Sequence, residues 1–450
     1  MKQLSFRDPL SKVYLAEEGI LRKLDTKSKF FFEELLSKNF FKKLQSLELI
    51  QGSKFLNKNG EEFIHHQKIE NFTQVNEMSS YQLYLSGLHT IDIMIESLKN
   101  DYQIKDASAW NVIFCNGKPI FLDIASFEKW NGDKTWVAYG QFVRHFIIPL
   151  LINKEMGLAT SKLFVINRDG IDPLEAYKLL GIKSFKSFVG FENVLLPYFL
   201  RSFKIKKSSN LKIDFEFNKK ILMRILNRLK KKLKNLEPDT KSFWSQYTLN
   251  RRHYSNSDIE IKKQIIIDFI QENPGRVLDI GCNTGEFLEI ASNYNNNDVH
   301  GIDVDENCIN FIQKNIKKKN INVSHVSIAN PVSPSGWKNS ETVGFLSKNI
   351  NYYENVLFLG IVHHLIVSER IPLEDILSLL STLTKKNLVF EFVSKKDEKF
   401  IQIASVNINL YDYFTKEYFE NLVTNFFKIK KIFNLKSNLN RHIYILEKKL

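Results

Sequence analysis

Two glycines and an acid in the second half of the chain are spaced as a site for a nucleotide-like ligand requires. Residues 277–287 read VLDIGCNTGEF, so an apolar run leads directly into Gly281 and Gly285. Glycine lets a ligand approach the backbone, and a helix beginning near Glu286 would direct its free N–H groups at the turn. Asp303 ends the next apolar run, where an acid can reach the ribose hydroxyls of a bound nucleotide.

The spacing of the turn distinguishes two kinds of ligand. Asp279 lies two residues before Gly281 in the pattern D-x-G-x-x-x-G, which differs from the G-x-G-x-x-G of pyrophosphate sites. An acid beside the turn would repel a pyrophosphate, but it suits the amino group of a methionine moiety. The alternative is a glycine turn that only caps a helix, and the acid at the end of the second strand argues against it.

This stretch resembles the S-adenosyl-L-methionine (SAM) signature of class I methyltransferases. The resemblance implies that the second-strand acid, Asp303, binds the ribose and that the turn lines the methionine side through Asp279, Gly281, Cys282, Asn283 and Gly285. Asn283 stands where glycine is commoner in that signature. Many class I members also have an acid near the adenine after the third strand, whereas this chain reads SIAN at 327–330.

Paired histidines, His363 and His364, follow the apolar run expected to form the fourth strand. Class I enzymes usually place the methyl acceptor at this edge, and a histidine there could remove a proton from an acceptor hydroxyl or amine. A packing or cofactor-shell role is the alternative. Methyl transfer from a sulfonium depends mainly on in-line positioning, so an essential base is not required.

Short apolar runs alternate with amphipathic ones from residue 276 onward. The expected strands are 276–280, 298–303, 322–328, 355–360, 387–393, 427–433 and 442–447. Helices are expected at 286–294, 306–319, 373–383 and 416–426. This rhythm predicts an α/β fold with a Rossmann-like, seven-stranded, mostly parallel sheet that is covered on both faces and binds ligands at the carboxyl ends of its strands.

A second group of polar residues lies in the first half of the chain. Asp106 and Asn111 in KDASAWN precede a turn at Asn116-Gly117 and a run that ends at Asp123. The pattern resembles the catalytic and metal loops of protein-kinase-like phosphotransferases. The resemblance implies that Asp106 is the base and that Asn111 and Asp123 are magnesium ligands for Mg-ATP, on an α+β domain with a reduced kinase-like fold.

This half also departs from that pattern. It has no glycine-rich phosphate loop and no V-A-I-K-type strand, and Arg22 or Lys23 is the available cation in a shortened hairpin. A helix over 29–47 offers Glu33 or Glu34 as the partner of that cation. A degenerate or recognition module is therefore an alternative to an active one, and a purely structural hairpin with Asp-Asn capping is a third.

The net charge of +14 invites a nucleic-acid interpretation, because clustered cations bind phosphate backbones. Lysine is scattered through the whole chain, however, so a solvated surface is favoured. The basic run Lys219–Lys234 has leucines at helical spacing, which predicts an amphipathic helix that packs on a neighbouring domain. Contact of this helix with a membrane surface or an anionic polymer is the alternative.

The three cysteines, Cys115, Cys282 and Cys308, have no C-x-x-C spacing. They cannot build a disulfide framework or a thiolate zinc site by themselves, which predicts a reducing cytosol. The first residues lack the apolar segment of an export signal, and the most apolar stretch, 142–152, is short and contains Arg144 and Pro149. We therefore expect a cytoplasmic protein without a membrane-spanning segment.

Several segments together resemble one family of bacterial methyltransferases, the nodulation-protein-related (NoeA-like) enzymes. They are RDP at 7–9, KDASAWN, LDIASFE, WVAYGQFVRHFIIPLL, DIGCNTG, NPVSPSGW and HHL. The resemblance implies a kinase-like module at 1–202, a basic helical connector at 203–242 and a SAM-dependent methyltransferase domain at 243–450. It implies O-directed transfer to a small-molecule or saccharide-type acceptor; a bifunctional kinase-methyltransferase and an RNA methyltransferase or nucleic-acid-binding protein are the alternatives.

Overall fold

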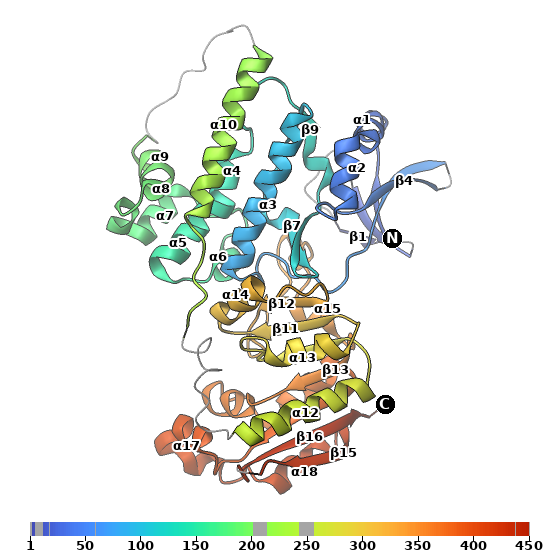
Figure 1. Ribbon diagram of the computed structural model, residues 1–450, viewed down its shortest axis with the longest axis vertical. Coiled ribbons are helices and arrows are strands. Elements are labelled where there is room, and N and C mark those ends of the chain that lie inside the picture. Colours follow the sequence, from blue (N-terminus) through green and yellow to red (C-terminus); the bar gives the residue numbers. More distant parts are fainter. Residues whose placement is uncertain are drawn as a thin grey trace. The chain divides into compact units, whose positions relative to one another are not determined.

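The computed structural model describes residues 2–4, 12–17, 19–58, 60–200, 214–242, 256–436 and 438–449. The chain forms two compact units, of which the first is Met1–Asp239 with Ser335–Thr342 and the second is Thr240–Pro334 with Val343–Leu450 (Figure 1). Each unit has its own hydrophobic core. The expected boundaries at residues 203 and 243 lie outside the described residues, as does the RDP segment.

Seven strands form the sheet of the second unit, in the order β12-β11-β10-β13-β14-β16-β15. Neighbouring strands from β12 to β14 run parallel, and β16 runs antiparallel to β14 and β15. The predicted Rossmann-like sheet is therefore confirmed. The strands are β10 (Val277–Ile280), β11 (Val299–Asp303), β12 (Ile321–His325), β13 (Tyr353–Phe358), β14 (Thr384–Val393), β15 (Phe427–Asn434) and β16 (Arg441–Lys448).

Helices cover both faces of this sheet, as predicted. The face that buries Val277 is covered by α12 (Asn256–Glu272), α13 (Glu286–Tyr294) and α14 (Glu306–Asn315). The face that buries Leu278 is covered by α16 (Leu373–Leu383) and α18 (Lys416–Val423). The shorter helices of this unit are α15 (Phe345–Asn349), η7 (His364–Ser368), α17 (Glu398–Ala404) and η8 (Ser405–Tyr411). The last two occupy a stretch where the sequence predicted no element.

The first unit begins with an antiparallel sheet of order β1-β2-β3-β5-β4. Its strands are β1 (Lys2–Gln3), β2 (Lys12–Ala16), β3 (Gly19–Lys23), β4 (Ser53–Lys58) and β5 (Glu61–His66). The helix expected over 29–47 is two helices, α1 (Thr26–Ser37) and α2 (Asn39–Ser46), because Lys38 between them has an extended backbone. Strands β2 and β3 form the expected short hairpin, in which residues 11 and 18 lie outside the described residues.

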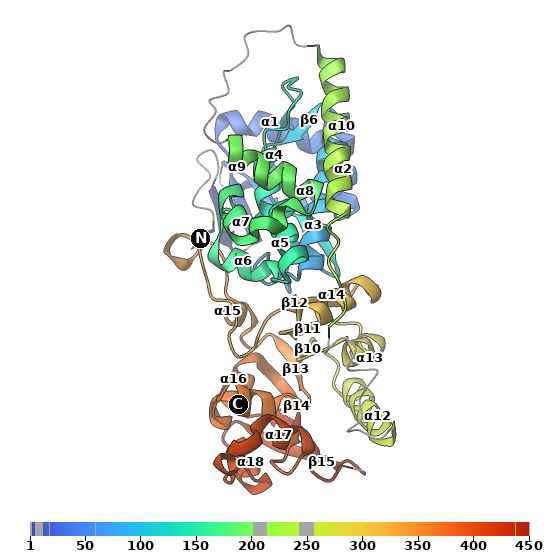
Figure 2. The same ribbon diagram turned by 90° about the vertical axis from the view of Figure 1, so that its left-hand side faces the viewer.

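A second hairpin carries the polar residues singled out in the first half. Strands β7 (Val112–Cys115) and β8 (Lys118–Phe121) pair across Asn116 and Gly117, whose φ values of 52° and 70° form the predicted turn. The long helix α3 (Ser80–Lys99) precedes it, and β6 (Tyr102–Ile104) pairs with β9 (Phe127–Lys129). Short helices follow together (Figure 2), namely α4 (Tyr139–Phe142), η3 (Val143–Ile147), α5 (Ile148–Met156), α6 (Thr160–Ile166), α7 (Pro173–Leu180), α8 (Phe188–Gly190), η5 (Phe191–Leu195) and α9 (Leu196–Leu200).

Helix α10 (Phe215–Lys234) packs into the core of the first unit. It buries four leucines, at positions 222, 226, 229 and 233, and it lies beside α3 (Figure 1). The helix set apart as a connector is therefore part of the first unit, because its apolar face needs that core to exclude water. In the described part of the chain, no helix has both the length and the apolarity needed to cross a bilayer.

Candidate active site

The glycine-rich turn after β10 has a backbone that few residue types adopt. Gly281 has a φ of 77° and Gly285 a φ of 88°, in the left-handed region that favours glycine. A Cβ on Gly281 would lie 2.7 Å from Cγ2 of Ile361, so a larger residue has no room there. Asn283 has a φ of 48°. Asparagine tolerates this region better than most side chains, which explains why it can replace the commoner glycine.

Asp303, at the end of β11, ties the turn to the neighbouring strand. Its carboxylate accepts a hydrogen bond from the backbone N–H of Asn283 at 2.8 Å and another from Asp305 at 2.8 Å. Burial raises the pKa of Asp303 to about 6, although these two N–H groups act in the opposite direction. A carboxylate has about four lone-pair positions, so Asp303 can still accept hydrogen bonds from a ligand's hydroxyls.

Asp279 lies near the end of β10 and is 2% exposed. Its Oδ2 atom has no hydrogen-bond donor among the described residues. Burial raises the pKa of Asp279 to about 7; attraction to Lys262 opposes that rise, and repulsion from Asp303 adds to it. A buried carboxylate without a donor is unfavourable, so a cationic ligand group would satisfy this atom.

A cavity of about 670 Å³ lies at the carboxyl ends of the parallel strands. It is lined by five of the predicted cofactor residues, namely Asp279, Gly281, Cys282, Asn283 and Asp303. Gly285 is not among the lining residues. A Cβ on it would lie 3.1 Å from Cγ1 of Ile312 in α14, so this glycine permits close helix packing. Residues 326–329, where many class I enzymes have an acid, form a mostly apolar wall.

His363 and His364 line the same cavity just after β13. Burial lowers the pKa of His363 to about 3, with further lowering by His364 and Arg441. The pKa of His364 is also lowered, first by burial and then by the charges of Arg441 and Lys399. Both imidazoles are therefore neutral near pH 7 and can accept a proton. Nδ1 of His363 has no hydrogen-bond partner among the described residues.

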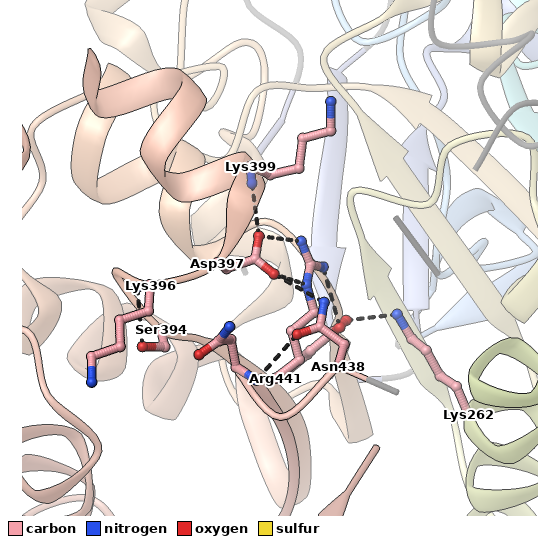
Figure 3. Close-up of polar contacts among 9 residues, drawn as sticks. Lys262, Ser394, Lys396, Asp397, Lys399, Asn438 and Arg441 are labelled. Atoms are coloured by element: carbon pink, nitrogen blue, oxygen red, sulfur yellow. Dashed lines mark hydrogen bonds and ion pairs between the residues drawn. The ribbon is translucent and has the colours of Figure 1, made fainter. Parts of the chain in front are cut away.

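A cluster of buried charges, which the sequence analysis did not identify, adjoins this cavity (Figure 3). Nζ of Lys262 lies 2.6 Å from Oε2 of Glu391. The guanidinium of Arg441 makes two hydrogen bonds to Asp397, of 2.8 and 2.9 Å, and lies 3.4 Å from Oε1 of Glu391. Lys262 and Arg441 both line the cavity. We refer to Lys262, Glu391, Arg441 and Asp397 as the four-charge cluster.

One signal of this cluster was present in the sequence. Glu391 interrupts the apolar run LVFEFV within a strand expected to be buried on both faces, and such strands are normally apolar throughout. A buried acid needs a cationic partner. Nothing in the sequence indicates that these partners are Lys262 and Arg441, because they lie 129 and 50 residues away.

The hairpin of the first unit brings Asn111 and Asp123 together at Ser126, and the backbone of Asp106 contacts Asn111. The side-chain amide of Asn111 donates to Oγ of Ser126 at 3.4 Å and to the backbone oxygen of Asp106 at 3.5 Å. Oγ of Ser126 donates to Asp123 at 2.8 Å. Among the described residues, no three His, Cys, Asp or Glu side chains gather as a metal site, so a metal there would depend on Asn111 and Asp123.

The cation of the first sheet pairs differently from that of active protein kinases, in which a strand lysine contacts a helix glutamate. Arg22 of β3 lies 2.8 Å from Oδ1 of Asp123 and is 6% exposed. Glu34 of α1 instead contacts Lys129 at 2.7 Å and Lys38 at 3.2 Å. The predicted metal ligand thus already has a cationic partner within the protein.

Comparison with known proteins gives matches over both units. The family model described as a methyltransferase domain matches residues 277–333. Nodulation protein NoeA of Rhizobium meliloti (strain 1021) is 25% identical, with 93% of this chain and 90% of that protein covered. The chain is similar to the N-methyltransferase NodS of Bradyrhizobium japonicum WM9 in complex with S-adenosyl-L-homocysteine, at 12% identity and a TM-score of 0.32. The match covers 45% of this chain and 98% of that chain. The bifunctional kinase-methyltransferase WbdD matches at 17% identity over 42% of this chain and 38% of its own, with a TM-score of 0.28.

Proposed function

This chain is a SAM-dependent methyltransferase whose second unit is a class I domain, and from that premise we propose that it methylates a hydroxyl of a small-molecule, saccharide-type acceptor. The observation that carries the proposal is the polar wall of the cavity beyond the strand ends. Its polar members are His363, His364, Ser368, Glu369, Lys399, Gln402 and Arg441, and the apolar residues Ile361, Leu365 and Ile403 lie among them. Each hydroxyl of a saccharide both donates and accepts hydrogen bonds, so a wall of mixed donors and acceptors would suit it.

Three parts of the cavity would hold the cofactor. Asp279 would bind the amino group, Asp303 the ribose hydroxyls, and residues 326–329 the adenine. The Oδ2 atom of Asp279 supports this assignment, because it would gain from an ammonium group the donor that it does not find among the described residues. When bound, SAM supplies a methyl group on a positively charged sulfur.

The two neutral histidines would supply the base that a hydroxyl acceptor needs. A hydroxyl must lose its proton during transfer, and an amine that is protonated near pH 7 must lose one before it can attack. His364 would take that proton, because it lines the cavity and its pKa, lowered by burial and by the charges of Arg441 and Lys399, leaves the imidazole unprotonated near pH 7. A base that is neutral at the working pH is available for every turnover.

Mass spectrometry of saccharide mixtures incubated with the enzyme and SAM carrying a labelled methyl group tests this proposal. We expect a product with one labelled methyl group on oxygen. His364→Ala should lower kcat by about 10- to 100-fold with little change in the Kd of SAM. His442→Ala is the matched control, since His442 is not among the residues lining the cavity. A label found on nitrogen, or an unchanged kcat for His364→Ala, would contradict O-directed transfer with this base.

The raised pKa of Asp279 gives a pH prediction for cofactor binding. Only the ionised carboxylate attracts an ammonium group, and burial places its pKa at about 7. The affinity for SAM should therefore fall by about 25-fold between pH 7.5 and 5.5. Isothermal titration at each pH measures this. Asp279→Asn should bind weakly with a flatter profile than the wild type, and its remaining pH dependence would come from Asp303, whose pKa is about 6. A wild-type profile as flat as that of the variant would refute the assignment.

A bifunctional kinase-methyltransferase is the second candidate function. The observation that favours it is the meeting of Asn111 and Asp123 at Ser126, with Asn111 also bonded to the backbone of Asp106, since Mg²⁺ prefers hard oxygen ligands on a rigid element. Binding of Mg-ATP would require Asp123 to exchange Arg22 for the metal.

Thermal melting tests this second candidate. Mg-ATP at millimolar concentration should stabilise the wild type by about 1–3 kcal/mol, and Asp123→Ala should abolish the shift. Asp133→Ala, in the exposed turn after β9, should retain it. A wild-type melting temperature that does not respond to Mg-ATP would leave the first unit as a recognition module.

The basic helix gives little support to a nucleic-acid function. Lys219 pairs with Asp101 at 2.8 Å, and Lys232 pairs with Glu192 at 2.7 Å. Lys230 pairs with Asp92, so these charges are compensated within the first unit. We propose the cytoplasm as the compartment, in keeping with three cysteines that are buried and form no disulfide.

A further inference from the structure

Lys262 is buried at the end of the cavity assigned to the methionine moiety. It is 8% exposed and comes from α12, which precedes the glycine turn in the chain. Its ammonium group lies 2.6 Å from Oε2 of Glu391, the contact drawn beside Lys262 in Figure 3. It also lies 5.1 Å from the centre of the Phe287 ring, in the first turn of α13. Burying a lysine is unfavourable unless its charge is paired. Lys262 also lines the cavity.

Lys262 and Asp279, which carry opposite charges, both line the cavity. The positive charge of Lys262 lowers the pKa of Asp279 against the effect of burial. The amino-acid end of SAM carries an ammonium and a carboxylate on the same carbon atom. A site for it therefore needs a carboxylate and a cationic side chain close to each other. Asp279 supplies the carboxylate, and Lys262 is a cation that lines the same cavity.

Within the four-charge cluster, Glu391 determines where the ammonium group lies. Glu391 is 0% exposed and contacts Lys262 on one side and Arg441 on the other. Arg441 is in turn held by its two hydrogen bonds to Asp397. An ammonium group has three donors, so Lys262 can keep its bond to Glu391 while it donates to a second carboxylate.

We propose that Lys262 binds the carboxylate of the methionine moiety of SAM and that Glu391 is the positioning residue that fixes it there. The proposal rests on the assignment of the SAM amino group to Asp279. Such a contact would let the second unit distinguish SAM from related molecules that lack the carboxylate, such as decarboxylated SAM. The identity of the methyl acceptor plays no part in it.

Isothermal titration of the full chain with three ligands tests the proposal without turnover. SAM has both the amine and the carboxylate, decarboxylated SAM has only the amine, and 5′-methylthioadenosine has neither. The wild type should bind SAM about 10- to 100-fold more tightly than decarboxylated SAM. Lys262→Met should remove that difference and leave the affinities for the other two ligands within about 3-fold of wild type.

Three variants separate the proposal from a structural effect. Lys431→Met is the control, because it also removes an ion pair to α12. Lys431 lies 3.1 Å from Glu272 at an exposed site. This variant should bind all three ligands as the wild type does. Lys262→Arg should retain part of the preference. Asp279→Asn should weaken SAM and decarboxylated SAM equally; if it weakens neither, the amino-group assignment fails rather than the role of Lys262.

Two results would overturn the proposal. The first is a wild type that binds SAM and decarboxylated SAM equally, a comparison that needs no variant and decides the matter even if Lys262→Met fails to fold. The second is a folded Lys262→Met, verified by circular dichroism, that loses affinity for all three ligands in the same proportion. That pattern would mean that Lys262 only supports the fold.

Discussion

Asp303→Ala is expected to weaken SAM binding by at least about 100-fold, because hydrogen bonds to a buried carboxylate contribute about 1.5–3 kcal/mol each and two ribose hydroxyls would lose theirs. The same change removes the acceptor of the Asn283 N–H group, so the glycine turn would also lose an anchor. Asp303→Asn should bind with intermediate affinity, since its amide has one acceptor oxygen and its NH₂ would face backbone N–H groups. Isothermal titration measures the Kd of SAM for the wild type, Asp303→Ala and Asp303→Asn.

Asp305→Ala provides the matched control for this experiment. Asp305 caps α14 by accepting from the N–H of Asn307 at 2.9 Å, and it is not among the cavity-lining residues. Its loss should cost about 1 kcal/mol of stability and leave SAM affinity close to that of the wild type. An Asp303→Ala protein that binds SAM within about 3-fold of wild type would remove the physical basis of the cofactor site.

Glu391→Leu is expected to lower the free energy of unfolding of the second unit by about 3–5 kcal/mol, the usual consequence of breaking a buried ion pair. Lys262 would keep its charge in a buried position, with its 2.6 Å partner gone. Arg441 would retain Asp397, which holds it through two hydrogen bonds. Thermal melting should show a decrease of roughly 10 °C in the transition of the second unit.

The double variant Glu391→Leu with Lys262→Met identifies the cause of this loss. Replacing both members of a buried pair with apolar residues also removes the buried charge that has lost its Glu391 partner, so the double variant should be more stable than Glu391→Leu alone. Lys431→Met breaks an exposed pair and should change stability by less than about 1 kcal/mol. If the double variant were less stable than the single one, packing around Glu391 rather than charge pairing would explain the loss.

The sequence by itself determined the features that depend on local chain geometry. Gly281 and Gly285 predicted the turn because their positive φ values exclude most side chains. Apolar runs with a β/α rhythm predicted all seven strands of the second unit. Since the carboxyl ends of neighbouring parallel strands lie at one edge of a sheet, Asp279 and Asp303 could be assigned to a common site before the fold was known.

Only the tertiary structure decided which charges meet. Glu391, Lys262 and Arg441 come together because β16 inserts antiparallel between β14 and β15 and α12 packs on the same sheet. The pairing of Arg22 with Asp123, 101 residues away, depends in the same way on how elements pack. Local periodicity specifies which face of an element is buried, but the partner of a buried charge is set by long-range packing. For this reason Lys262, which we propose as the carboxylate-binding residue, could not be identified from the sequence.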